Sequence, residues 1–225
     1  MSERRFSFVS GEYYHIYNRG NSKQVVFQDS YDYVRFQRLL FLSNSSQNFK
    51  IEYIRDKKID FYESNRKEKL VAIGAYCLMP NHFHILLTPL IENGVSVFMK
   101  KLGTGYSMYF NKKYDRAGSL FEGKFKAKIA EDDEYLKYLF AYIHLNPLKL
   151  IDPEWKEKGV LDAGPSKQYL ESYGYSSLSD FLGVSRKEGR ILDVHKFPQF
   201  FQSKEDVKDN LYSWFSDRKD LSASV

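Results

Sequence analysis

The fold is decided by the stretch Val71-Ala-Ile-Gly-Ala-Tyr-Cys-Leu-Met-Pro-Asn-His-Phe-His-Ile-Leu-Leu-Thr88. Residues 71–79 form an apolar run of strand length. Pro80 and Asn81 break this run, because proline lacks an amide donor and the pair is typical of turns. Residues 82–88 then resume as a second run. The stretch therefore predicts two neighbouring strands joined as a hairpin.

Two histidines lie close together in the second of these strands. Side chains alternate between faces along a strand, so His82 and His84 project from one face and Phe83 from the other. Such a pair can hold one metal ion, although two histidines satisfied in a core or at the surface would give the same pattern. Cys77 is the single cysteine, which disfavours a cysteine-rich zinc cluster.

Strand and helix signals alternate on both sides of the hairpin. Their order predicts an α+β fold with a ferredoxin-like arrangement, in which helices pack on one face of an antiparallel sheet. The predicted elements, in chain order, are a strand over 13–19, a helix over 30–42, the hairpin, a helix over 95–114, an extended segment over 119–129 and a helix from Asp132 to Asn146.

The length of 225 residues fits one domain with an appendage. We place the domain at residues 1–180 and a C-terminal extension, with no assigned role, at residues 181–225. Within the domain, the highly charged segment 55–69 is interpreted as a solvated excursion between strands.

The composition is that of a soluble protein with a preference for polyanions. Hydrophobic residues make up 43% and charged residues 28%, which excludes disordered and collagen-like classes. We expect no membrane span, no secretory signal and no internal disulfide, and therefore a cytoplasmic location. A net charge of +5 and an aromatic content of 17% favour nucleic acid as a partner, although aromatic residues also fill ordinary cores.

The last predicted helix carries a second set of polar side chains. At 100° per residue, Tyr142 and Asn146 lie on one flank of its apolar stripe and His144 lies on the other. An amide oxygen at Asn146 can complete a metal site, with a phenol at Tyr142 beside it. A border tyrosine and a helix-capping asparagine before Pro147 would show the same spacing.

Basic residues concentrate in segment 100–128, which carries a net charge of +6 and interleaved aromatic residues. This combination is typical of a surface that binds nucleic acid through phosphate contacts and stacking. A solvated helix face is the alternative, because most runs of charge simply face water.

Four motifs in this order resemble those of single-tyrosine transposases with the histidine–hydrophobic–histidine (HUH) signature, and in particular the REP-associated tyrosine transposases. The resemblance covers about residues 13–180. The chain departs from the family pattern at Lys124, where arginine is common, at Tyr173-Gly-Tyr175, where a tryptophan motif is usual, and in segment 55–69, which looks like an insertion. The motifs are Tyr14-His-Ile-Tyr-Asn-Arg-Gly20, Met79-Pro-Asn-His-Phe-His-Ile-Leu-Leu87, Gly118-Ser-Leu-Phe-Glu-Gly-Lys-Phe-Lys-Ala-Lys128 with Glu131-Asp-Asp-Glu-Tyr-Leu136, and Ala141-Tyr-Ile-His-Leu-Asn-Pro147.

The resemblance implies a ferredoxin-like HUH domain that cuts and rejoins single-stranded DNA. Carried over by position, His82 and His84 match the metal-binding pair, Tyr142 the nucleophile and Asn146 a third ligand. The expected cofactor is Mg²⁺ or Mn²⁺. The residues expected to contact DNA are Lys100, Lys101, Arg116, Lys124, Lys126, Lys128 and Arg19.

The reaction that follows is attack of Tyr142 on phosphorus, giving a 5′-phosphotyrosine and a free 3′-hydroxyl. The expected substrate is a single strand that carries a hairpin of the REP palindrome type, and the expected assembly is a monomer or a homodimer. Two rival interpretations stay open. One is a DNA-binding regulatory module that does not cleave, and the other is a metal-dependent phosphodiesterase that uses water.

Overall fold

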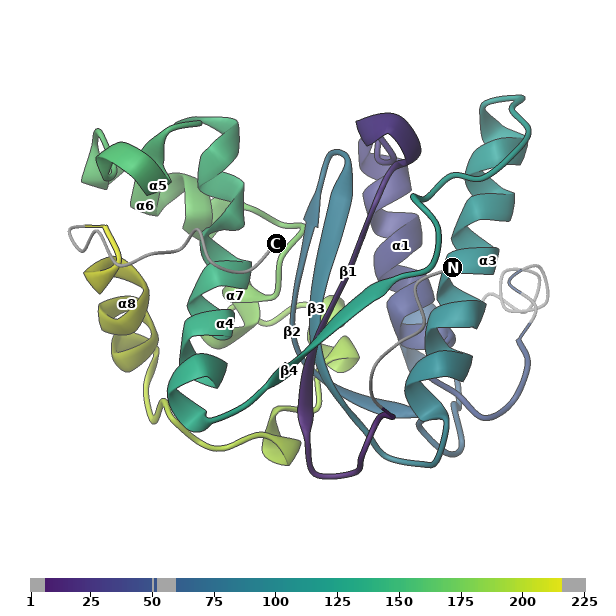
Figure 1. Ribbon diagram of the computed structural model, residues 1–225. Helices are drawn as coiled ribbons and strands as arrows, with labels where there is room; N and C mark the ends of the chain where they lie inside the picture. Colours follow the sequence, from purple (N-terminus) through teal and green to yellow (C-terminus); the bar gives the residue numbers. More distant parts are fainter. Residues whose placement is uncertain (1–6, 50, 52–59, 216–225) are drawn as a thin grey trace.

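The computed structural model describes residues 7–49, 51 and 60–215, whose strands form one four-stranded antiparallel sheet (Figure 1). The strand order β2-β3-β1-β4 is that of a ferredoxin-like sheet, as the sequence predicts. β2 and β3 are the predicted hairpin, and their closing pair is Met79 with His82. The strands are β1 (Tyr13–Arg19), β2 (Val71–Met79), β3 (His82–Pro89) and β4 (Lys126–Ala130).

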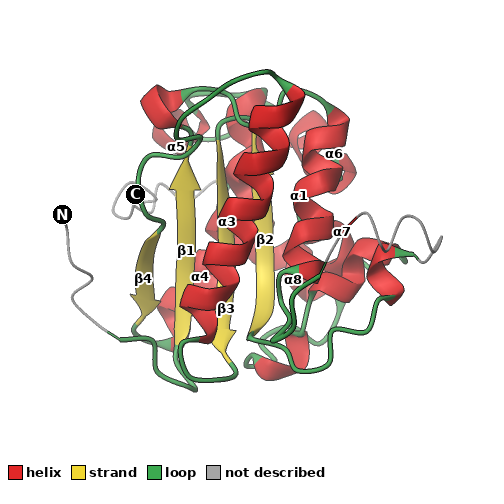
Figure 2. Cartoon of the chain, turned by 90° about the vertical axis from the view of Figure 1, so that its right-hand side faces the viewer, coloured by secondary structure: helices red, strands yellow, loops and turns green. Residues whose placement is uncertain are grey.

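Helices cover both faces of this sheet, so the expectation of a single covered face was wrong (Figures 1 and 2). The reason lies in β2, which is buried at every position. A strand without exposed residues needs apolar cover on both sides, and its continuous apolar run already carried that signal. One face is covered by α1 (Ser30–Leu42) and α3 (Gly94–Lys113), and the other by α4 (Asp133–Leu145), α5 (Trp155–Lys158), α6 (Ala163–Ser172), α7 (Leu178–Phe181) and α8 (Lys204–Ser213).

Alternate residues of the two central strands serve different layers. In β1 and β3, side chains such as Ile16 and Ile85 enter the core beneath α1 and α3. The residues between them face α4, and the strand register aligns them in rows across the sheet. His84 pairs with Tyr17 of β1, and His82 pairs with Arg19. The α4 face of the sheet therefore carries the histidines.

Two other predicted segments differ from the structure. β4 begins at residue 126 rather than 119, because the chain before it turns at Gly123, whose φ of +66° suits glycine. In the charged segment 55–69, residues 55–59 lie outside the described residues. The remainder is not wholly solvated, because Tyr62 of a short 3₁₀ helix is buried edge-on against Phe41.

The chain beyond residue 180 packs into both layers. Ile191 is buried in the core beneath α1 and α3, whereas Val207 and Leu211 of α8 are buried beside α4. Phe197 lies against Gly74 of β2, where an added Cβ atom would stand 2.7 Å from its ring. The predicted division at residue 180 stays a prediction, but these contacts join the extension to the domain. None of the helices in the described part of the chain is both long and apolar enough to cross a membrane.

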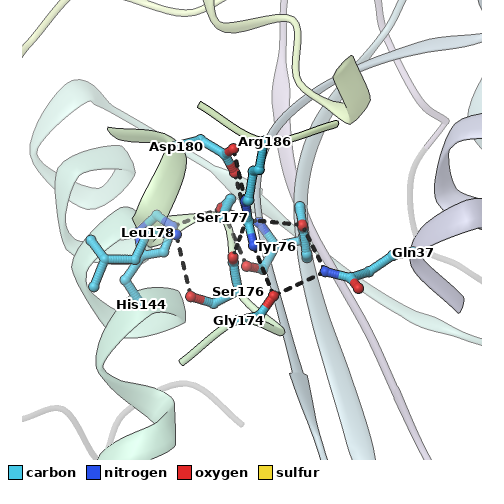
Figure 3. A network of polar contacts seen from close by, with 9 residues as sticks. All are labelled: Gln37, Tyr76, His144, Gly174, Ser176, Ser177, Leu178, Asp180 and Arg186. Carbon is cyan, nitrogen blue, oxygen red and sulfur yellow. Dashed lines mark hydrogen bonds and ion pairs between the residues drawn. The ribbon is translucent and has the colours of Figure 1, made fainter. Parts of the chain in front are cut away.

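A polar network connects this extension to β2 and α4 (Figure 3). Arg186 pairs with Asp180 and donates to the Tyr76 hydroxyl at 3.2 Å. His144 Nε2 lies 2.8 Å from Ser177 Oγ, which also accepts from the Tyr76 amide at 2.9 Å. His144 therefore projects away from the Tyr142 flank of α4, as the helical spacing predicts, and its role is structural.

We expect the protein to lose stability as the pH falls below about 6.5. Burial lowers the pKa of His144, and likewise that of His15, from 6.5 to about 3. Both imidazoles stay neutral in the folded protein while they protonate in the unfolded chain, so protons favour unfolding between pH 6.5 and 3. Each such histidine should lower the free energy of unfolding by about 1.4 kcal/mol per pH unit.

Urea denaturation at pH 7.5, 6 and 5 measures this dependence. His144→Gln keeps a polar partner for Ser177 but cannot titrate. It should therefore reduce the slope of the free energy of unfolding against pH by about 1.4 kcal/mol per pH unit, the contribution of one histidine. A slope equal to that of the wild type would contradict the assignment of His144 as a buried neutral imidazole.

Candidate active site

Strand β3 places two imidazoles on the face beneath α4. The His82 and His84 rings lie with their centroids 4.9 Å apart. His84 is 1% exposed, whereas His82 at the hairpin end of the strand is only partly buried. Alternation along the strand explains why both face the same way while Phe83 packs into the opposite core.

Hydrogen bonds orient both rings. Asn81 Oδ1 lies 2.7 Å from His82 Nδ1 and can only accept, so that nitrogen carries the proton and Nε2 keeps its lone pair. His84 Nδ1 lies 2.8 Å from Nε2 of His15, which comes from β1. His84 Nε2 is buried and has no hydrogen-bond partner among the described residues. A buried nitrogen without a partner is costly in a folded protein, and a bound ligand would satisfy it.

Both imidazoles are neutral at physiological pH. Burial, followed by the charge of Arg19, lowers the pKa of His82 to about 4. Burial also lowers the pKa of His84 well below its ordinary value, and the neighbouring His82 adds to this shift. Neutral imidazoles offer their lone pairs to a cation without first losing a proton.

Helix α4 brings Tyr142 and Asn146 to the same place. The Tyr142 ring lies edge-on to His84, with centroids 5.4 Å apart. Asn146 is the residue at which α4 ends before Pro147, and its Nδ2 donates to the Tyr142 carbonyl at 3.2 Å. The Asn146 side chain also interacts with the His82 imidazole and the Tyr142 phenol. Asn146 thus both caps the helix and joins the site.

Three side chains of the site could hold a divalent cation. His82 and His84 each offer an imidazole nitrogen, and Asn146 offers an amide oxygen. Among the described residues, no three histidine, cysteine or carboxylate side chains come together as a metal site, so the third donor here would be the amide oxygen of Asn146. Three protein donors would leave coordination positions open for water or phosphate oxygens, as in catalytic rather than structural metal sites.

A lysine that the sequence analysis did not identify lies over the tyrosine. Lys156 of α5 places Nζ 4.1 Å from the centroid of the Tyr142 ring. Burial, followed by the charge of Lys149, lowers the pKa of Lys156 to about 7. Burial raises the pKa of Tyr142 to about 12, so its phenol is protonated at neutral pH. No local pattern around Lys156 distinguishes it from the other lysines of the chain.

His15 is the second residue that was missed. It lies in the motif of residues 14–20 and alternates with Tyr17 and Arg19, which places it on the face beneath α4. Its contact with His84 depends on the register between β1 and β3, which alternation alone does not determine. His15 is a positioning residue that sets the orientation of the His84 ring.

Comparison with known proteins finds a matching family and a similar fold. A family model described as "Transposase IS200 like" matches residues 8–146. The chain belongs to the IS200-like transposase family. The matched range contains His15, His84 and Tyr142 and ends at Asn146, whereas Lys156 lies beyond it.

A solved structure of a REP-associated tyrosine transposase bound to a REP hairpin has a similar fold. It aligns with a TM-score of 0.52 and 14% identity, over 100% of this chain and 98% of that one. No match was found among curated proteins. The alignment confirms the predicted α+β architecture, and the family match confirms the transposase resemblance.

The basic residues expected to bind DNA lie on both faces of the sheet, some beneath α4 and others in the layer of α1 and α3. Strand register places three of them on the face beneath α4: Arg19 opposite His82, Lys126 opposite Tyr17 and Lys128 opposite His15. Lys124 is exposed two residues before β4. These four lie on or next to the strands that carry the site.

The other three lie in the α1–α3 layer, away from the strands that carry the site, and their contact with DNA stays a prediction. Lys100 and Lys101 belong to α3, and Lys101 Nζ donates to the Ser45 and Gln47 carbonyls at 2.6 and 2.7 Å. Arg116 donates to Asn111 at 3.2 Å near the end of α3. Segment 100–128 runs from this helix to the sheet, so its charges do not form one surface.

Proposed function

We propose that the chain is a DNA transposase that cleaves and rejoins single-stranded, hairpin-bearing DNA through a 5′-phosphotyrosine at Tyr142. The observation that carries the proposal is the unpartnered, buried Nε2 of His84 beside the Tyr142 ring. Family membership supports the DNA substrate. The related structure bound to a REP hairpin supports hairpin recognition.

The covalent step forms a bond between Tyr142 Oη and phosphorus and breaks the bond from phosphorus to the 3′-oxygen. The phenolic proton passes to solvent, and the departing 3′-oxygen takes up a proton to become the hydroxyl. A pKa of about 12 makes the phenol a weak nucleophile until charge nearby favours its ionised form. Lys156 Nζ lies over the ring and would supply such charge while it is protonated, which its lowered pKa of about 7 limits to a fraction of the molecules at neutral pH.

His82, His84 and Asn146 would hold Mg²⁺ or Mn²⁺ at this site. When bound, the cation supplies Lewis-acid polarisation of the phosphate oxygens. The imidazole nitrogens suit Mn²⁺ better than Mg²⁺, which prefers oxygen ligands. The roles of the protein side chains are to present these donors and to hold Tyr142 against them.

Incubation with a library of hairpin-bearing single strands, followed by denaturing electrophoresis, tests the proposal. The expected result is a protein–DNA adduct that forms with Mn²⁺ and disappears with a chelator. A phosphodiesterase that uses water would cleave without forming an adduct, and a regulatory binding module would do neither. Either of those outcomes would refute a tyrosine transposase.

Replacement of Lys156 by methionine should slow adduct formation roughly ten- to thirtyfold. Methionine keeps the length and apolar contacts of the lysine stem but removes the charge over the Tyr142 ring. A desolvated cation–π contact contributes about 2 kcal/mol, and each 1.4 kcal/mol or so corresponds to a factor of ten. Single-turnover kinetics would measure the effect, and Lys156→Arg should recover most of the rate. If the methionine variant formed the adduct at a rate within twofold of wild type, Lys156 would have no part in the mechanism.

Lys126→Ala combined with Lys128→Ala should weaken DNA binding and reduce its dependence on salt. Each lost phosphate contact lowers the slope of log K against log salt by about 0.7 for a single strand. The matched control is Lys100→Ala with Lys112→Ala, which removes two exposed charges from α3 in the opposite layer. Titration of one hairpin at several salt concentrations compares the pairs. Equal slopes for the two variants would contradict placement of the DNA beneath α4.

A further inference from the structure

A row of aromatic rings leads away from the nucleophile along one flank of α4. Tyr138 lies 6.0 Å from Tyr142 between ring centroids, and Tyr135 lies a further 5.5 Å from Tyr138. Spacings of three and four residues stack these side chains along the helix. Trp214, where α8 ends, stands edge-on to Tyr138 at 5.5 Å. We call Tyr135, Tyr138, Tyr142 and Trp214 the aromatic track.

The rings of the aromatic track beyond the nucleophile remain accessible. Tyr135, Tyr138 and Trp214 are all only partly buried, in contrast to Tyr142 at 5% exposure. The row is therefore not simply the core face of α4, which is formed by fully buried residues such as Leu139. These three rings pack against the core on one side, and their partly exposed aromatic surface is available to a planar ligand.

Residues of the sheet lie near the aromatic track. Tyr17 of β1 is partly buried, and its ring lies 6.1 Å from His84. Tyr135 is close enough to Tyr17 to contribute to the raised pKa of that phenol, whose main cause is burial. Lys126 and Lys128 of β4 share this face of the sheet. Positive charge thus accompanies the rings, as it does in proteins that bind single strands.

Negative charge surrounds the start of α4, at the end of the aromatic track that is far from Tyr142. Asp132 caps α4, and Glu131, Asp133 and Glu134 surround this helix start. Four carboxylates repel a phosphate backbone, so the favourable stretch ends near Tyr135. From Tyr142 to Tyr135 the helix rises about 10 Å.

We infer that the aromatic track binds about two or three unpaired nucleotides that adjoin the phosphate attacked by Tyr142. Tyr135 and Tyr138 stack on one another with centroids 5.5 Å apart, so a base would stack on the row from outside rather than between these two rings. Stacking on a side-chain ring requires a base that is not enclosed within a duplex, which favours a single strand. The inference rests on the proposed function and gives the C-terminal extension, through Trp214, a part in substrate binding.

Binding to a hairpin with thymidine tails of zero to six nucleotides tests the track. Tyr142→Phe protein is used, so that the DNA is not consumed. The affinity should rise with each of the first two or three thymidines and then level off. Tryptophan fluorescence should fall as the tail binds, and this quenching should vanish in Trp214→Phe.

Tyr135→Leu and Tyr138→Leu should each reduce the gain in affinity from the tail roughly fivefold or more, the low end of one base–aromatic stack. Tyr31→Leu is the matched control, because Tyr31 is 76% exposed on α1 in the opposite layer. Circular dichroism verifies that each variant is folded.

An affinity independent of tail length, or quenching that persists in Trp214→Phe, would overturn the aromatic track. The covalent adduct assay on protein with Tyr142 intact separates this failure from failure of the proposed function. If the adduct forms but affinity does not depend on tail length, only the assignment of the aromatic track is wrong. If affinity depends on tail length but no adduct forms, the tyrosine mechanism is wrong and the binding site stands.

Discussion

Tyr142→Phe should reduce adduct formation by at least about 10⁴-fold, as expected when a nucleophile is removed. The phenylalanine ring keeps the edge-on packing against His84 and His15, so the fold and the metal donors stay in place. Only the oxygen that attacks phosphorus is lost. Affinity for hairpin DNA should therefore stay within about twofold of wild type, measured by a filter-binding or anisotropy titration.

Tyr138→Phe is the matched control for this result. Tyr138 is the next ring along the same flank of α4, and its replacement likewise removes one hydroxyl while keeping an aromatic face. This variant should form the adduct at close to the wild-type rate. If Tyr142→Phe were as active as Tyr138→Phe, a different nucleophile would have to be found.

His84→Gln should abolish metal-dependent cleavage and weaken Mn²⁺ binding by more than about 100-fold. It removes a buried nitrogen that has no partner in the described chain, so the loss cannot arise from a broken hydrogen bond at that atom. Residues that only orient a ligand typically contribute 10- to 100-fold in metal affinity. His15→Gln should fall in that smaller range. Asn146→Ala should weaken the metal less than His84→Gln, because a neutral amide oxygen is the weaker ligand.

Calorimetric or spin-resonance titration with Mn²⁺ measures these affinities without reference to activity. His144→Gln serves as the control, because His144 is equally buried and also has one nitrogen paired and one without a partner among the described residues, but lies on the opposite flank of α4, away from Tyr142. A His84→Gln variant that binds Mn²⁺ as tightly as His144→Gln would show that the metal, if one is used, is held elsewhere.

Local patterns in the sequence predicted most of the fold, whereas the roles of the site residues came from the resemblance to a transposase family. The strand bounds of β1 and β2 and the helix bounds of α1 follow from apolar periodicity and turn residues, and the structure agrees with them. The phase of α4 likewise separates Tyr142 from His144 correctly. Each of these features depends only on neighbours within a few positions along the chain.

The missing parts depend on contacts between distant segments. His15 meets His84 across 69 positions, and Lys156 reaches Tyr142 only because the chain turns back after α4. The second helical layer was not predicted for the same reason, and neither was the division of the basic residues between the two layers. Charge density along segment 100–128 does not tell which side of the sheet each lysine occupies.

The alternation of β1 and β3 between two faces restricts how this chain can change over time. Every second residue of these strands belongs to the core beneath α1 and α3, and those between them face α4, where they include His15, His82 and His84. Deletion or insertion of a single residue within either strand would exchange the two sets and bury His84 among the phenylalanines under α1. Descendants of this chain can therefore vary in length in the connections, whereas within the strands they are confined to substitutions.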